Sequence, residues 1–183
     1  QALLASAGLT PDDLEIVLYP DFGQATALRE GQVDAATGFA NNEPVQLEQA
    51  GIETVVLRVD EITPLPGPGL TVGTSTLAQK GSLLDAFTAA TLRAMQEIIA
   101  DPESGLDSAI AEVPELGEDR ETQLAILRAT VEMWQSPYTD QHGLGAIDRE
   151  AWTRSVEFMR TLPETTLPPA LTVEQLVTEE LIR

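Results

Sequence analysis

The sequence predicts an α/β fold in which a small parallel sheet adjoins a helical half. Over residues 1–63, apolar segments of strand length alternate with short helical segments. Short loops that contain glycine or proline join these segments. From residue 82 onward, the apolar residues recur with the period of a helix. Strands and helices that alternate through short loops are typical of a parallel sheet covered by helices.

The first residues, QALLASAGLTPDD, have the features of a helix end. Leu3 and Leu4 lie on one face, Gly8 is a natural C-terminal cap, and Pro11 follows it. No Ser, Thr, Asp or Asn precedes Gln1 to cap the start of this helix. We therefore expect that the chain begins inside a longer protein.

Three strands and two helices are predicted next. The apolar segments at residues 14–19, 33–39 and 54–59 read as strands, and residues 70–73 could form one more. The segments between them, residues 24–30 and 43–50, read as short helices closed by glycine. Together these elements predict a thin sheet of three or four parallel strands.

A Pro/Gly-rich connector, PLPGPGL, separates this region from the helical half. Proline and glycine also punctuate the helices expected afterwards, which are residues 82–100, 102–113, 119–135, 148–161 and 172–182. The predicted division is an α/β lobe with its connector at residues 1–74 and a helical C-terminal half at residues 75–183.

The charge and the residue types exclude several classes of function. The chain has 30 Asp and Glu against 10 Lys and Arg, a formal net charge of −20, so nucleic acid is not an expected partner. It has no cysteine and one histidine, which leaves little for a thiolate or imidazole metal site. We expect neither a metal nor another cofactor. No apolar run approaches the roughly 20 residues of a membrane span.

The best candidate site is the sequence FANNEP, which follows the second predicted strand. Ligands of open parallel sheets bind where strands end and helices begin. Asn41 or Asn42 could instead cap a helix, with Glu43 near the positive end of its dipole and Pro44 in its first turn. Capping does not require two adjacent amides beside Phe39. Both interpretations, a cap and a ligand contact, therefore stay open.

A second candidate loop follows the first predicted strand. It contains Tyr19, Asp21 and Phe22, in a chain with only 4% aromatic residues. Aromatic rings offer flat apolar faces to a planar ligand, and tyrosine adds a hydroxyl. The alternative is that one or both rings belong to the core, which is the better interpretation for Phe22.

Several segments together resemble a known family. They are GLTPDDLEIV, ALREGQVDAATGFANNEPVQLEQAG, LPGPGL, the stretch from GAIDREAW to EFM, and TEEL near the end. In these segments the chain resembles the periplasmic solute-binding proteins of the thiamine-pyrimidine-precursor-like family, across nearly its whole length. VDAATGFANNEP is the most specific of these similarities.

The resemblance implies a type II periplasmic-binding-protein fold, in which two α/β lobes clamp a ligand. The chain would begin inside the second lobe, so residues 1–74 would be part of that lobe and the N-terminal lobe would be missing. Of the seven proposed contacts, the two amides and Glu43 would bind the polar edge of a planar heterocycle. Tyr19 or Phe39 would provide an aromatic face. These contacts are Tyr19, Asp21, Phe22, Phe39, Asn41, Asn42 and Glu43.

The resemblance also implies a function. The chain would be the solute-binding component of an ATP-driven importer, would bind a thiamine pyrimidine precursor or a riboflavin-like solute, and would not be an enzyme. Its partners would be the membrane subunits of the importer and the missing lobe, whose absence could allow self-association. It would lie in the periplasm or outside the cell, with its export signal or lipid anchor upstream.

Two other functions stay open. One is an acidic domain that binds a protein partner through its helical half. The other is the enzyme branch of the same family, which makes the thiamine pyrimidine. That branch relies on a cysteine-rich stretch and on histidine chemistry, and this chain has no Cys and a single His. The chain does not match the enzyme branch at these positions.

Overall fold

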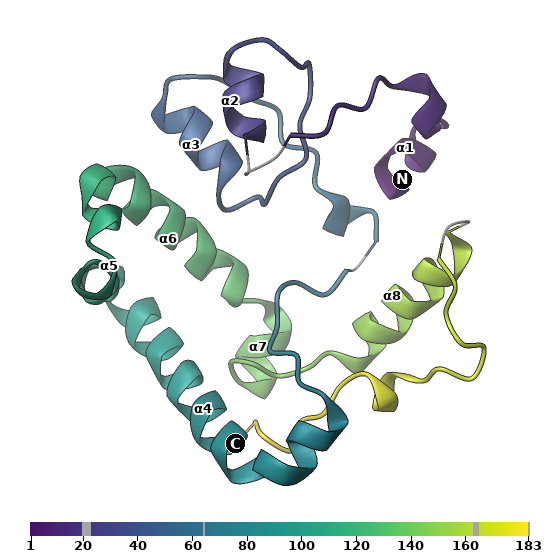
Figure 1. Cartoon of the computed structure of the whole chain (residues 1–183), viewed down its shortest axis with the longest axis vertical. Helices are drawn as coiled ribbons and strands as arrows, with labels where there is room; N and C mark the ends of the chain where they lie inside the picture. Colours follow the sequence, from purple (N-terminus) through teal and green to yellow (C-terminus); the bar gives the residue numbers. More distant parts are fainter. Residues whose placement is uncertain (20–22, 64, 163–164, 183) are drawn as a thin grey trace. The chain divides into compact units, whose positions relative to one another are not determined.

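The structure is a computed structural model, and it describes residues 1–19, 23–63, 65–162 and 165–182. Its helices divide between two compact units (Figure 1). Apart from the first two residues, the first unit combines residues 3–58 with residues 94–136, and the second combines residues 59–93 with residues 137–183. The predicted division after residue 74 stays a prediction.

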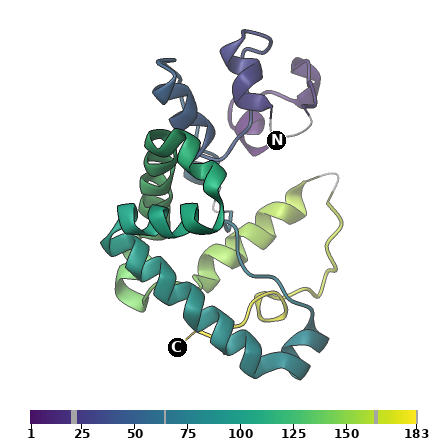
Figure 2. The same cartoon turned by 60° about the vertical axis from the view of Figure 1, so that its left-hand side comes forward.

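The first unit is built around two short helices and two longer ones. α3 packs against both α2 and α6, and α6 also packs against α5 (Figure 2). Apolar side chains buried in this unit are Ala27, Leu47, Leu106 and Val131. The helices of this unit are α1 (Ala2–Ser6), α2 (Gln24–Arg29), α3 (Glu43–Gln49), α5 (Pro102–Glu112) and α6 (Arg120–Trp134), with 3-10 turns η1 (Pro11–Asp13) and η3 (Pro114–Asp119).

In the second unit, the C-terminal segment packs against α8 (Arg149–Thr161). Val156 of α8 and Val173 of the segment are buried. The other elements of this unit are α7 (Pro137–His142) and the 3-10 turns η2 (Val59–Glu61) and η4 (Val173–Gln175). α4 (Thr74–Ala100) contributes residues to both units, and its backbone departs from helical dihedrals at Lys80, with φ −124° and ψ 25°.

The predicted α/β fold is wrong. Across residues 1–19, 23–63, 65–162 and 165–182 the structure contains helices, turns and irregular segments, with no strand and therefore no parallel-sheet lobe. The segments expected as strands remain non-helical but unpaired, and Leu18 and Val55 are 88% and 87% exposed. A strand needs a neighbour to satisfy its backbone N–H and C=O groups. Apolar content marks a segment as suited to a sheet but cannot supply that neighbour.

Most of the predicted helices are present in the structure. Both short helices and the helices expected within residues 102–161 are confirmed, with ends that differ by at most one residue. The helix expected at residues 82–100 begins earlier than predicted, because α4 starts at Thr74 and continues through Gly81. The helix expected at residues 172–182 is wrong, because only the 3-10 turn η4 forms there. The Thr172 and Gln175 capping box closes this single turn, and β-branched residues such as Val177 and Thr178 favour helices weakly.

Gly31 and Gly51 end their helices as the sequence predicts. Their φ angles are +68° and +75°, in the left-handed region that glycine tolerates best. The Gly51 N–H donates to the Glu48 carbonyl oxygen, and the Ile52 N–H donates to the Leu47 carbonyl oxygen, both at 2.8 Å. This pair of bonds is the Schellman motif, which satisfies carbonyls that a helix end leaves unpaired.

None of the helices within the described part of the chain combines the length and the hydropathy that crossing a bilayer demands.

Candidate functional site

Four of the seven predicted contact residues lie together at the start of α3. We call residues 39–44, with the sequence FANNEP, the FANNEP turn. Phe39, Asn41, Asn42 and Glu43 belong to it, and the Asn42 N–H donates to the Phe39 carbonyl oxygen at 2.9 Å, which closes the turn. Tyr19 lies elsewhere, and Asp21 and Phe22 fall outside the described residues.

The carboxylate of Glu43 accepts hydrogen bonds from two residues of the FANNEP turn. Its side chain is buried, with the residue only 7% exposed. The Phe39 N–H donates to Glu43 Oε2 at 2.7 Å, and Asn42 Nδ2 donates to Glu43 Oε1 at 3.4 Å. Gly38 makes room for this carboxylate, because a Cβ at residue 38 would lie 2.6 Å from Glu43 Oε2. The negative charge at the first turn of α3 also suits the helix dipole.

The two asparagines do not cap α3 through their side chains. Asn42 occupies the N-cap position, but its side-chain oxygen accepts a hydrogen bond from Gln46 Nε2 at 2.9 Å. Asn41 Nδ2 donates to the Thr130 hydroxyl oxygen of α6 at 2.8 Å. Neither amide therefore caps α3 through its side chain, so the capping interpretation of these two side chains is wrong.

The FANNEP turn also presents groups outward. Phe39 is 57% exposed, so its ring is accessible to a flat partner. Asn41 Oδ1 has no hydrogen-bond partner in the described part of the chain, whereas Asn42 Oδ1 and the Glu43 carboxylate are occupied. The turn thus offers one aromatic face and one amide acceptor, which suits a planar ligand with a polar edge.

Tyr19 is engaged with the end of α2. Its hydroxyl donates to Gln32 Oε1 at 3.2 Å, and Gln32 Nε2 donates to Glu30 Oε2 at 2.6 Å. These contacts are exposed, and none of them involves the FANNEP turn. Within the described residues, Tyr19 therefore shares no hydrogen bond with the asparagines.

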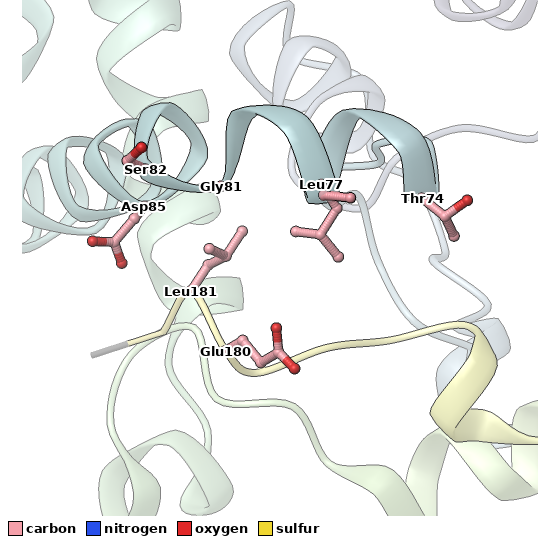
Figure 3. Close-up of a pocket in the computed structure, with 8 residues that line it drawn as sticks. Thr74, Leu77, Gly81, Ser82, Asp85, Glu180 and Leu181 are labelled. Atoms are coloured by element: carbon pink, nitrogen blue, oxygen red, sulfur yellow. The ribbon is translucent and has the colours of Figure 1, made fainter.

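A hollow of about 570 Å³ lies in the second unit, between the first turns of α4 and the C-terminal segment (Figure 3). Leu77 and Leu181 give it apolar walls, and Asp85 and Glu180 place carboxylates beside them. None of the predicted contact residues that the structure describes lines this hollow. The described residues also contain no group of three His, Asp or Glu side chains arranged to hold a metal ion.

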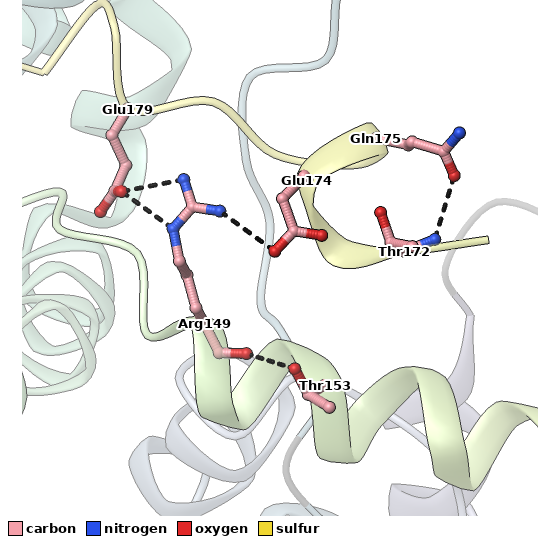
Figure 4. A network of polar contacts seen from close by, with 6 residues as sticks. All are labelled: Arg149, Thr153, Thr172, Glu174, Gln175 and Glu179. Atoms are coloured by element: carbon pink, nitrogen blue, oxygen red, sulfur yellow. Dashed lines mark hydrogen bonds and ion pairs between the residues drawn. The ribbon is translucent and has the colours of Figure 1, made fainter. Parts of the chain in front are cut away.

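A polar network in the second unit was not apparent from the sequence. Arg149, the first residue of α8, donates from Nε and a terminal nitrogen to Glu179 Oε2 at 3.1 and 3.0 Å. Its other terminal nitrogen lies 4.0 Å from Glu174 Oε1 (Figure 4). At the far end of α8, Arg160 donates to the Leu171 carbonyl oxygen at 2.9 Å. These contacts hold the C-terminal segment, and their spacing of up to 30 residues explains why no local pattern marks them.

The pKa of the Glu174 carboxyl is lowered, first by a hydrogen bond from its own backbone N–H, then by the Thr172 hydroxyl and the Arg149 guanidinium. A lowered pKa in the folded state adds stability above the ordinary pKa of about 4.3, and this stability is lost as the pH falls through the lowered value. We expect Glu174→Gln to melt below the natural protein at pH 7, and by a smaller gap at pH 3. Circular dichroism melts measure this gap, and an equal gap at both pH values would contradict the assignment.

Comparison with known proteins gives two matches. A sequence model of the family described as NMT1/THI5 like matches residues 1–105, which include the FANNEP turn. The chain is also 34% identical over 183 residues to the riboflavin-binding protein RibY of Chloroflexus aurantiacus. That alignment covers 99% of this chain and 51% of the relative, so the chain spans about half the length of the curated relative it matches. No solved structure matches the chain significantly.

Proposed function

Because the chain belongs to the NMT1/THI5-like family, we propose that it is the solute-binding component of an ATP-driven importer and binds a small planar heterocycle. The observation that carries this proposal is the FANNEP turn, which lies inside the residues that match the family. It combines an exposed aromatic ring with an amide oxygen that accepts no hydrogen bond from the described residues. The name of the relative, a riboflavin-binding protein, favours a riboflavin-like solute over other heterocycles. A thiamine pyrimidine precursor is the other candidate.

The proposed recognition uses two kinds of contact. The Phe39 ring stacks on one face of the heterocycle, and Asn41 Oδ1 accepts a hydrogen bond from its polar edge. Asn42 and Glu43 hold the turn in the geometry that presents these groups. The remaining proposed contacts are Tyr19, Asp21 and Phe22.

The proposal includes a location and a mode of action. The protein works in the periplasm or outside the cell, and it passes its solute unchanged to the membrane subunits of the importer. Binding without chemistry agrees with the relative, which is named as a binding protein. The exposure of Leu18 and Val55 does not favour the alternative of a self-sufficient acidic interaction domain, because such a domain would cover these side chains.

Titration of riboflavin into the natural protein at its full length tests the proposal. Transfer of the flavin ring from water to the face of Phe39 is expected to change flavin fluorescence on binding. At a free concentration about 100 times the dissociation constant, the solute should add about 2.7 kcal/mol to the free energy of unfolding. Ribitol, which has no ring, is the matched control and should change neither signal. Absence of a response to riboflavin and to the thiamine pyrimidine would overturn the proposal.

A further inference from the structure

Thr130 of α6 is the one described residue outside the FANNEP turn that bonds to the Asn41 side chain. The two residues are 89 positions apart, and both are part-buried where α3 packs against α6. Asn41 Nδ2 lies 2.8 Å from Thr130 Oγ1, and Thr130 Oγ1 lies 2.8 Å from the carbonyl oxygen of Ile126. The hydroxyl is therefore placed between a helix carbonyl and the amide.

The hydrogen-bonding capacity of the Thr130 hydroxyl determines which end of the Asn41 amide faces it. Thr130 has a single hydroxyl proton, and a threonine within a helix commonly donates it to the carbonyl four residues earlier. Here the acceptor is Ile126 O, which has no proton to offer in return. The Thr130 oxygen is then free only to accept, so it selects the Nδ2 end of the Asn41 amide. Asn41 Oδ1, the acceptor end of the amide, is then the end that Thr130 leaves available.

We propose that Thr130 is a positioning residue, which orients the Asn41 amide so that the site offers an acceptor and selects solutes with a ring N–H donor. This inference rests on the proposed function. A flipped amide would present Nδ2 to the ring N–H, and two donors repel each other. Discrimination for the N–H thus depends on α6, a helix that need not touch the solute itself.

The test compares the affinities of two solutes, riboflavin and its 3-methyl derivative, which lacks the ring N–H. The variants are Thr130→Val, which has the same shape without the hydroxyl, and Thr130→Ser, which keeps the hydroxyl. Thr91→Val is the matched control, because the Thr91 hydroxyl donates to the Phe87 carbonyl oxygen at 2.9 Å in the same manner and contacts no asparagine. Fluorescence titration gives, for each protein, the dissociation constant of the 3-methyl derivative divided by that of riboflavin. This ratio measures the preference for the ring N–H.

One hydrogen bond changes this ratio by about 2- to 12-fold. We expect Thr130→Val to lower the ratio by this factor and Thr130→Ser and Thr91→Val to preserve it. Any steric effect of the methyl group is common to all these proteins, so the change between proteins reports the bond. A merely structural role of Thr130 would lower the melting temperature and leave the ratio unchanged.

The outcomes separate the inference from the function on which it rests. If the natural protein does not bind riboflavin, the proposed function fails. If it binds riboflavin and Thr130→Val keeps the natural ratio, the inference is overturned. Should Thr130→Val not fold by circular dichroism, Asn41→Ala decides instead, since removal of the acceptor must lower the ratio by the same factor. If Asn41→Ala has the same ratio of dissociation constants as the natural protein, the inference is overturned.

Discussion

Replacement of Leu47 with alanine is expected to lower the free energy of unfolding by about 3 kcal/mol. Leu47 is 4% exposed and lies on α3, which packs against α2 and α6. Truncation removes the transfer free energy of the side chain and leaves a cavity among helices that collapse only in part. Because α3 begins at the FANNEP turn, we also expect weaker riboflavin binding. Urea unfolding followed by circular dichroism measures the first effect, and fluorescence titration measures the second.

The matched control is Leu83→Ala on α4. Leu83 is 63% exposed, so the same change of side chain removes little buried surface. We expect its free energy of unfolding to stay within about 0.5 kcal/mol of the natural value. Equal losses for the two variants would show that Leu47 is not part of a packed core.

Gly38→Ala is expected to lower the free energy of unfolding by about 2 kcal/mol. The new Cβ would lie 2.6 Å from Oε2, 2.8 Å from Cδ and 3.0 Å from Cγ of Glu43. The carboxylate must move, and it then loses the hydrogen bond from the Phe39 N–H. The part-buried Phe39 N–H, left without a partner, carries most of this cost. Glu43→Ala removes the same bond and should destabilise by a similar amount.

The double variant Gly38→Ala/Glu43→Ala tests whether the two residues act through the same interaction. With alanine at residue 43 there is no carboxylate to displace, so Gly38→Ala should cost almost nothing in that background. The two single effects are therefore expected to be strongly non-additive, as in other pairs that share one interaction. Gly67→Ala is the control, because a Cβ there meets no atom within 4 Å. Additive losses in urea unfolding would show that Gly38 and Glu43 act separately.

The helical part of the fold could be predicted because its signals are local. Asp101, Asp119 and Asp148 each accept a hydrogen bond from a backbone N–H in the first turn of the helix they precede, as N-cap residues do. Gly31 and Gly51 end α2 and α3 through backbone conformations that other residues rarely adopt. Signals of this kind act within four or five residues, so sequence patterns find them.

The candidate site could be predicted in part. Its position at the start of a helix, and the grouping of Phe39, Asn41, Asn42 and Glu43, followed from adjacent residues. Their roles did not. One asparagine was expected to cap the helix or both to contact a ligand, whereas the Asn42 side chain bonds to Gln46 and the Asn41 side chain to Thr130. The partner in α6 is 89 residues away, and no local pattern connects it to the turn.

The sequence by itself determined the family, the net negative charge and most of the helix ends, because charge follows from composition and capping depends on residues that are neighbours along the chain. Only the tertiary structure decided that the apolar segments stay unpaired and that Asn41 bonds to Thr130. Strand pairing requires a second segment at hydrogen-bond distance, and the orientation of an amide depends on which atom faces it. Both conditions join residues that are distant in sequence, and a pattern of residue types cannot specify them.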